Sequence, residues 1–131
     1  MRTYSVEEAR ALLPSVVPVL ERMRAALQEL QAVKAAASVD ARGVSADGAL
    51  TENPWVEDSG ENVPQRLADI VQQCLDQLSQ WSIEVKDPAQ GLIDFYHDRG
   101  GTVVYLCYLL GEPDIAYWHT IDGGFAARRP L

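Results

Sequence analysis

Two stretches of the chain carry apolar residues at alternating spacings of four and three, the heptad pattern of helices that pack along one another. The first stretch contains Ala9, Leu13, Val16, Leu20, Met23, Leu27 and Leu30. The second contains Leu67, Val71, Cys74, Leu78 and Trp81. Two such helices joined by a loop pair as an antiparallel hairpin. The pattern therefore predicts helices over residues 5–36 and 64–82 with coiled-coil packing between them.

The first predicted helix has a defined start and two irregular positions. Ser5 and Glu8 have the spacing of a capping box, in which each side chain accepts a hydrogen bond from the other residue's backbone amide. Pro14 and Pro18 lie inside the helical pattern. Because proline lacks an amide hydrogen and crowds the preceding turn, we expect a kink or a break near them.

The periodicity stops between the two helices, over residues 38–63. This segment carries a single basic residue, Arg42, against Asp40, Asp47, Glu52, Glu57, Asp58 and Glu61. Long acidic segments without periodicity are usually disordered or functional. We predict a mobile acidic loop here.

The last third of the chain has the pattern of β-strands. Apolar and aromatic residues dominate residues 92–97, 102–110 and 115–121, which turn-forming residues separate. The short separators predict an antiparallel meander over residues 91–121, followed by a tail over 122–131. The predicted fold is therefore α+β: an antiparallel two-helix hairpin packed on a three-stranded antiparallel sheet.

The turns also predict which side chains share a face of the sheet. We expect His97 to pair with Thr102 and Leu110 with Ile115. This register gives a core face that includes Ile93, Phe95, Leu106, Tyr108, Tyr117 and His119. The opposite face then includes Asp94, Tyr96, Tyr105, Cys107, Trp118 and Thr120.

The central predicted strand has large apolar side chains on both sides, which is typical of a strand that is covered on both faces. The helical hairpin covers only one of them. A two-fold mate is the commonest arrangement in homo-oligomers, so we predict a homodimer. The alternative is that the tail after Gly123 folds back over the sheet.

Composition and charge exclude several kinds of partner. The chain has 131 residues, which suits a single domain over 1–131, and a formal net charge of −8. That charge repels phosphate backbones, and the basic residues form no patch, so we expect no nucleic-acid partner. The start of the chain lacks a signal-peptide pattern, and no apolar run reaches the roughly 18 residues of a membrane span. We therefore predict a cytoplasmic protein that does not bind membranes.

The chain has few residues with distinctive chemistry. Its two cysteines, Cys74 and Cys107, form no CxxC pair, and their positions in a predicted helix and strand indicate reduced, buried thiols. Gly-rich phosphate loops, GxSxG and HExxH motifs are absent from the sequence. Whether the protein is an enzyme therefore stays open.

Polar residues near the C-terminus form the main candidate site. Glu112 lies in a predicted turn, His119 in the last predicted strand, and Asp122 and Arg128 beyond it. Carboxylates and an imidazole suit a divalent metal ion or an acid/base pair. A bend at the glycine pair after Asp122 would bring it close to His119, so these two are the candidate metal ligands. The alternative for His119 is a structural imidazole bonded to a backbone carbonyl or a carboxylate.

Asp94 is a second candidate, because its strand is largely apolar. A carboxylate in such a strand needs a hydrogen-bond donor, for which the Tyr105 hydroxyl and an arginine of the tail are the candidates. A structural and a functional role are both open for Asp94.

Three stretches carry a resemblance to a known family: YSVEEARALLP at 4–14, EVKDPAQGLIDF at 84–95, and VYLCYLLGEPDIAYWHTIDGGFAARRPL at 104–131. They resemble a bacterial family of uncharacterised proteins, domain-of-unknown-function family 2203. The resemblance covers both ends and most of the chain, and it implies no established activity. It adds weight to the positions of the family's tail pattern, which here are Glu112, Trp118, His119, Asp122, Gly124 and Arg128.

Two hypotheses on function follow. In the first, the protein is a non-catalytic module that mediates self-association or docking to another protein through its helices and its sheet. In the second, the protein binds a small ligand or a divalent metal, with or without catalysis, through Asp94, Glu112, Trp118, His119, Asp122 and Arg128. We favour the first, because the chain lacks a catalytic motif and each polar residue has a structural explanation.

Overall fold

The computed structural model describes residues 2–43 and 54–131, with side chains for residues 2–36 and 62–131. Two helices, α1 (Val6–Gly43) and α2 (Pro54–Gln80), precede a sheet with the strand order β1-β2-β3-β4-β5. The strands are β1 (Ile83–Asp87), β2 (Leu92–Arg99), β3 (Thr102–Leu109), β4 (Tyr117–Thr120) and β5 (Arg129–Pro130), and a short 3-10 helix, η2 (Phe125–Ala127), precedes β5. Every neighbouring pair is antiparallel. The predicted α+β class is confirmed, but the sheet has five strands rather than three.

Helix α1 begins where the capping box predicts. The Glu8 amide donates to the Ser5 hydroxyl at 3.0 Å, and the Ser5 amide donates to the Glu8 carboxylate at 2.9 Å. The expected break is wrong, because the helix is continuous through Pro14 and Pro18. Both prolines are exposed, whereas neighbouring apolar residues such as Val16 are buried, and this burial outweighs the lost amide bonds.

The segment between the helices is shorter than predicted. Helix α1 continues to Gly43, beyond the expected end at residue 36, and α2 already begins at Pro54 and ends at Gln80. The backbone of residues 38–43 and 54–63 is therefore helical, not a loop. The predicted mobility of residues 44–53 lies outside the described residues.

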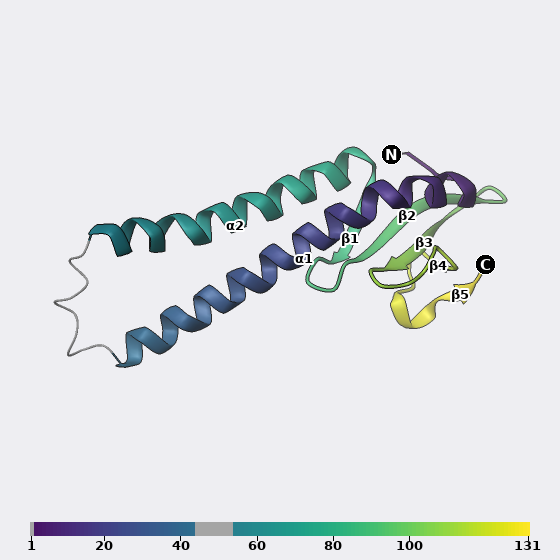
Figure 1. Cartoon of the computed structure of the whole chain (residues 1–131). Coiled ribbons are helices and arrows are strands. Elements are labelled where there is room, and N and C mark those ends of the chain that lie inside the picture. Colours follow the sequence, from purple (N-terminus) through teal and green to yellow (C-terminus); the bar gives the residue numbers. More distant parts are fainter. Residues whose placement is uncertain (1, 44–53) are drawn as a thin grey trace.

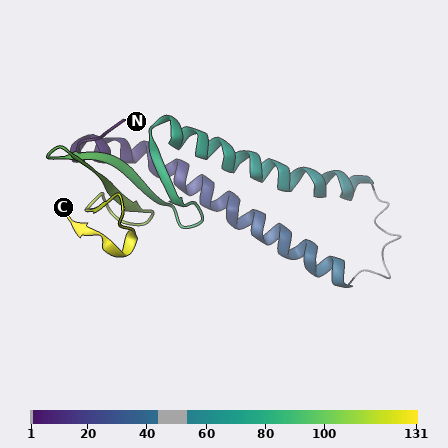
Figure 2. The ribbon, with the colours of Figure 1, turned by 180° about the vertical axis from the view of Figure 1, so that it is seen from behind.

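One cluster of buried residues connects the helices and the sheet. Figures 1 and 2 show α1 and α2 side by side and running in opposite directions, with one end of the pair at the sheet and the other beyond it. The fully buried residues of the cluster come from α1, α2 and the sheet, and include Val16, Leu20, Met23, Leu78, Ile93, Phe95 and Leu106. The sheet face that carries Ile93, Phe95 and Leu106, here called the helix face, is thus the core face.

The prediction missed the two outer strands. Strand β1 pairs with β2 and alternates Ile83 and Val85 with Glu84 and Lys86, a period of two that predicts a strand. Strand β5 has only two residues, so no pattern in the sequence marks it. It pairs with β4 through Tyr117 and Pro130.

The register of the sheet differs from the predicted register in two ways. Strand β2 meets β3 with Arg99 opposite Thr102, a shift of two residues from the expected pairing, so the faces of these strands are as predicted. Strand β4 meets β3 with Trp118 opposite Leu106, where we expected His119. This shift of one residue reverses the faces of β4. His119 therefore lies on the face opposite the helices, and Trp118 packs against the core cluster.

A contact in the preceding turn accounts for the reversed face of β4. The Glu112 carboxylate accepts a hydrogen bond from the Leu109 amide at 2.7 Å, which ends the β3 ladder there. The chain then turns through Gly111, with φ of 108°, and does not rejoin the sheet until Tyr117. The tight turn that would pair Leu110 with Ile115 does not form.

Strand β3 is buried on both sides within a single chain. Leu106 faces the helices and Cys107 faces away from them, and both are buried. We had considered a second copy of the chain and the C-terminal tail as covers for the face away from the helices. In the structure the tail covers part of this face, because Arg128 packs over Tyr117 there. The two-sided strand is therefore no reason to require a second copy, and the homodimer stays a prediction.

Candidate functional site

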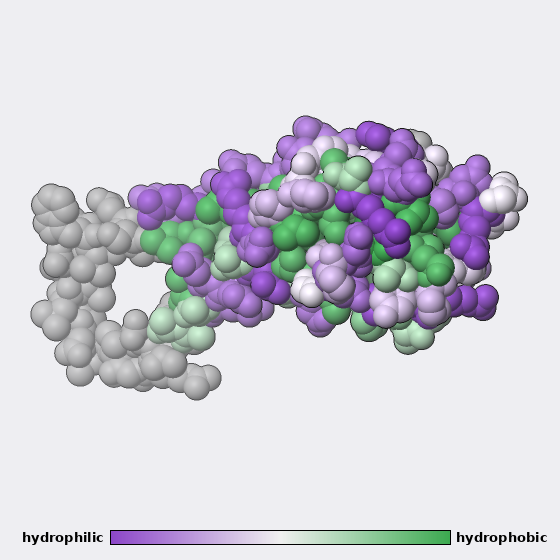
Figure 3. Space-filling view, turned by 45° about the vertical axis from the view of Figure 1, so that its right-hand side comes forward, coloured by the Kyte–Doolittle hydropathy of each residue, from purple (hydrophilic) through white to green (hydrophobic). Residues whose placement is uncertain are grey.

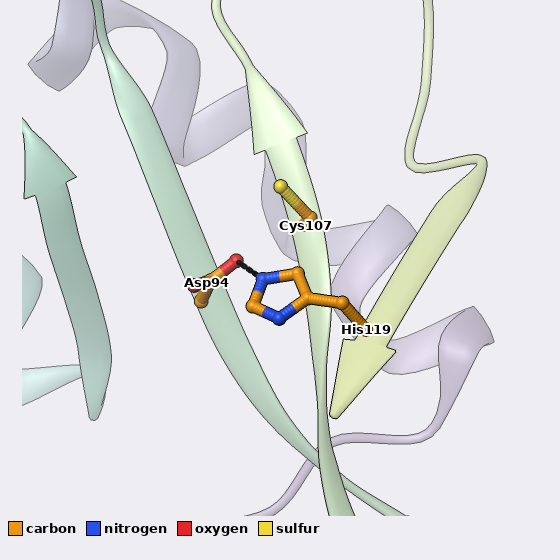
Figure 4. Close-up of side chains that lie close together, drawn as sticks. All are labelled: Asp94, Cys107 and His119. Atoms are coloured by element: carbon orange, nitrogen blue, oxygen red, sulfur yellow. Dashed lines mark hydrogen bonds and ion pairs between the residues drawn. The ribbon is translucent and has the colours of Figure 1, made fainter. Parts of the chain in front are cut away.

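Three adjacent strands bring one carboxylate, one thiol and one imidazole together on the face opposite the helices (Figure 4). Asp94 on β2 lies opposite Cys107 on β3, and His119 on β4 lies opposite Tyr105, one step along the same face of β3. One ligand atom from each of Asp94, Cys107 and His119 lies within 4.8 Å of the other two. The exposed fractions are 1%, 1% and 2%, so the cluster is sealed from solvent.

Both ring nitrogens of His119 have partners. Nδ1 lies 2.8 Å from the Thr120 carbonyl oxygen, and because a carbonyl only accepts, Nδ1 carries a hydrogen and donates it. Nε2 lies 3.1 Å from Oδ1 of Asp94. A hydrogen bond between these two atoms requires one proton, carried either by Nε2 or by the carboxyl group. The pair is thus neutral overall, which suits a buried site.

The Asp94 carboxyl group is only partly satisfied. Burial raises the pKa of Asp94, and the nearby His119 charge opposes that shift. Oδ2 of Asp94 is buried and has no hydrogen-bond partner. Buried polar atoms without a partner are rare, and this oxygen is available to accept a hydrogen bond or to bind a ligand.

Cys107 is buried next to the same carboxylate. Burial first, and the Asp94 charge second, raise the pKa of the Cys107 thiol to about 12, and the Arg128 charge acts in the opposite direction. The thiol is therefore protonated at neutral pH and is a poor nucleophile by itself. A bound cation is the usual means by which such a thiol loses its proton.

Aromatic residues and one more carboxylate form a side of the cluster. The Tyr105 ring lies 5.3 Å from the His119 ring, and the ammonium group of Lys86 lies over Tyr105 at 4.7 Å. The hydroxyl groups of Tyr96 and Tyr105 donate to the same Glu84 oxygen at 2.6 and 2.9 Å. These hydrogen bonds lower the pKa of Glu84.

Arg128, which is paired with Glu112, lies on another side of the cluster, next to Cys107. Nη1 of Arg128 donates to both Glu112 oxygens, at 2.9 and 3.0 Å. The guanidinium group also lies 4.2 Å from the Tyr117 ring centre and 4.0 Å from that of Phe125. An ion pair that is also enclosed by aromatic rings is held more firmly than an exposed one.

A family model whose description is "uncharacterized conserved protein (DUF2203)" matches residues 2–131. The chain belongs to the DUF2203 family. It has no significant match among the curated proteins. It also has none among the solved structures. In the described parts of this DUF2203 chain, neither helix is long and apolar enough to cross a bilayer.

The DUF2203 chain brings some of the predicted site residues together and separates others. His119 contacts Asp94, which we had expected to meet the Tyr105 hydroxyl or an arginine of the tail. Asp122 is exposed and does not belong to the group around His119, so the structure does not support the expected His119 and Asp122 pair. Trp118 lies elsewhere, with the Arg99 guanidinium 4.2 Å from its ring centre.

Cys107 is the site residue that sequence reasoning missed. The alternation of β2 and β3 placed Asp94 and Cys107 on one face, and that was a usable signal. His119 was predicted on the other face because of the one-residue error in register. With His119 on the wrong face, the three ligand types of this DUF2203 chain could not be connected.

Proposed function

We propose that this protein binds a divalent transition metal ion, Zn²⁺ in the first instance, through Asp94, Cys107 and His119. The observation that carries the proposal is the convergence of an oxygen, a sulfur and a nitrogen ligand within 4.8 Å in a buried site. All three are ligand types that zinc accepts. Carboxylate, thiolate and imidazole ligands together are less suited to Mg²⁺ or Ca²⁺, which prefer oxygen.

The hydrogen bonds of His119 fit this role. Metal-binding histidines commonly donate their second ring N–H to a carbonyl or carboxylate, which fixes the ring and the tautomer. Here Nδ1 donates to the Thr120 carbonyl, and this leaves Nε2 directed at Asp94. Ligand atoms of a tetrahedral zinc site lie roughly 3.3–3.7 Å apart for bond lengths of about 2.0–2.3 Å. The 3.1 Å separation of Nε2 and Oδ1 is close to that spacing.

The charges also fit a divalent ion. A carboxylate from Asp94 and a thiolate from Cys107 would neutralise two positive charges, so that the loaded site stays neutral as a buried site should. The free Oδ2 of Asp94 supplies a further ligand atom at the same site. Because the three side chains are almost fully buried, they favour a structural or regulatory ion over a catalytic one, which needs an open position.

Metal analysis of the purified chain tests this proposal. We expect the wild-type chain, incubated with ZnCl₂ and desalted, to retain a stoichiometric ion, and Asp94→Asn, Cys107→Ser and His119→Gln to lose it. Cys74→Ser is the matched control, because Cys74 is also a buried free thiol but lies in the helical core. A wild-type chain that retains no ion, or ligand variants that retain as much as the control, would contradict the proposal.

A second function, self-association or docking through the helices, is supported by half-buried apolar side chains beyond the sheet. Leu30 and Val33 on α1 and Val63 on α2 are each half-buried. On the face seen in Figure 3, apolar patches lie between hydrophilic ones along the helical pair. Half-buried apolar side chains of this kind can be covered further by a partner helix, so we propose coiled-coil packing and a homodimer made through this pair.

Sedimentation equilibrium tests the dimer. We expect a dimer at micromolar concentration, and Leu30→Glu should shift the protein toward the monomer because it places a charge in the apolar contact. Gln31→Glu is the control, because Gln31 is adjacent to Leu30 and its own side chain is exposed. A wild-type monomer would refute the dimer and would leave the metal proposal standing. For both functions the proposed setting is the cytoplasm of a bacterium, where thiols stay reduced.

A further inference from the structure

The C-terminal residues 123–131, here called the strap, lie against the metal-ligand cluster. Figures 1 and 2 show η2 and β5 beside β4, on the side of the sheet away from α1. Arg128 is the strap residue that reaches inward, since its guanidinium group packs on Tyr117, which lies directly opposite Cys107 on the neighbouring strand. The strap thus closes the cluster on the Cys107 side.

The strap is held in place by few interactions. Its strand has two residues, and its last backbone hydrogen bond runs from the Leu131 amide to the Ala116 carbonyl at 2.9 Å. Phe125 and Leu131 are exposed large apolar residues, so they add little burial. In contrast, the side chains of Arg128 and Glu112 are only 14% and 19% exposed. The Arg128 and Glu112 ion pair is therefore the main contact that keeps the strap closed.

Two glycines form the start of the strap. Glycine has no Cβ and allows large changes of backbone angle, which is a frequent property of hinges. At Gly123 a Cβ would come within 3.2 Å of both Ala127 and Thr120, so the closed strap packs tightly there. At Gly124 a Cβ would meet nothing within 4 Å. Opening of this segment would break the two-residue pairing of β5 with β4, and it would leave the longer ladder between β3 and β4 in place.

We infer that the strap is a gate, held shut by the Arg128 and Glu112 ion pair, that controls how fast reagents and metal ions reach Cys107, His119 and Asp94. For metal ions the inference rests on the proposed function; for access to Cys107 it stands alone. Local opening of a short, weakly held segment requires less free energy than global unfolding. The gate therefore affects rates of exchange more than affinity.

Labelling of Cys107 in metal-free protein tests the gate. In a Cys74→Ala background the only remaining thiol is Cys107. We expect a disulfide reagent such as dithiobis-nitrobenzoate to label Glu112→Gln and Arg128→Gln about tenfold faster than the parent, because each variant removes one charge of the pair. Arg129→Gln is the matched control, since it is the adjacent, exposed arginine, and its guanidinium group lies 5.5 Å from the ring centre of Trp118 on the opposite face of the sheet. It should label at close to the parent rate.

The labelling rate of the Arg128→Gln variant shows whether the gate limits access to Cys107 or whether the Arg128 charge only changes the reactivity of the thiol. The Arg128 charge favours the thiolate of Cys107, so its loss by itself makes the thiol less reactive. Faster labelling of this variant therefore reports access to the thiol. Parent-like or slower labelling of both variants would overturn the gate, and so would an increase that only matches a loss of global stability measured by urea unfolding.

Measurement of zinc binding and zinc release distinguishes failure of the gate from failure of the proposed function. If the wild-type chain binds Zn²⁺, its release to excess chelator should be faster in Glu112→Gln and Arg128→Gln, with the equilibrium affinity nearly unchanged. Zinc binding with unchanged labelling and release rates would refute the gate alone. Faster labelling in a protein that binds no zinc would refute the metal proposal and leave the gate as the cover of a buried thiol.

Discussion

The two faces of the sheet are both buried, but by different means. The helix face carries Ile93, Phe95 and Leu106, and it is covered by the apolar residues of the helices. The face of the cluster carries Asp94 and His119, the two buried polar residues among the described residues, and it is covered by paired polar groups and the strap.

This difference determines how each face responds to change. Burial of apolar surface is roughly proportional to area and does not depend on protonation. Burial of polar groups depends on each having its partner, and it fails when one partner is removed. The helix face should therefore tolerate changes of pH and shape gradually. The face of the cluster should respond sharply to the loss of a single hydrogen-bonding group.

The largest expected effect is on the polar face. In metal-free protein, His119→Ala should destabilise the fold by about 3–5 kcal/mol, because it leaves the Asp94 carboxyl group buried without a partner. Urea unfolding of the metal-free chain measures this. The double variant Asp94→Leu/His119→Leu should recover part of the loss, since no charge is left buried. A double variant no more stable than His119→Ala would show that the pair is not the cause.

The helix face should show a large effect without such a rescue. Leu106→Ala should cost about 2–4 kcal/mol through lost burial and the cavity that remains, because Leu106 is fully buried. The loss should be the same at pH 5 and at pH 8. If the stability lost by Leu106→Ala varies with pH, the two faces are coupled through β3, and the helix face does not respond independently of protonation.

A smaller effect with a defined pH dependence is expected at Glu84. Hydrogen bonds from Tyr96 and Tyr105 lower the pKa of Glu84 below its ordinary value of 4.5, so its ionised form stabilises the fold above pH 4.5. Glu84→Gln should lose less than about 1 kcal/mol at pH 7, because the carboxylate is more than a third exposed and is screened by water. As the pH falls below 4.5, wild type loses this contribution and the difference should disappear. A difference that grows at low pH would contradict the assignment.

The smallest effect should come from one of the two phenol donors. Tyr96→Phe removes one hydrogen bond to Glu84 and leaves the Tyr105 hydroxyl in place. We expect a loss of about 0.5 kcal/mol in thermal or urea unfolding, the lower end of the usual value of one hydrogen bond, because the second phenol donor remains. Metal retention should not change. A larger loss of stability, or loss of the bound metal ion, would mean that Glu84 and its two phenol donors belong to the metal site.

Local patterns were sufficient for the helices and for much of the sheet. Most heptad positions of α1 and α2 are buried, as at Val16 and Leu78, whereas Leu27 and Leu30 near the far end of α1 are half-buried. The Ser5 and Glu8 capping box forms as expected. Strand β1 could have been predicted from its alternation, but its five residues directly follow a long helical pattern. Strand β5 could not, because two residues carry no period.

The candidate site was only half predictable, because it depends on the register of β4. Arg10 holds the turn before β4 by donating from Nε and Nη2 to the Ile115 carbonyl, at 3.0 and 2.8 Å and 105 residues away in sequence. The Glu112 carboxylate ends the β3 ladder in the same turn. Neither contact leaves a trace in the local pattern of apolar and polar residues.

The sequence by itself determined the class of fold, the helical seams, the start of α1 and the common face of Asp94 and Cys107, because these follow from neighbours a few residues apart. Only the tertiary structure decided that His119 joins them. Side chains of a strand alternate between faces, so a shift of one residue moves an imidazole from one side of the sheet to the other. That shift depends on contacts between distant parts of the chain, and these contacts complete the cluster of Asp94, Cys107 and His119.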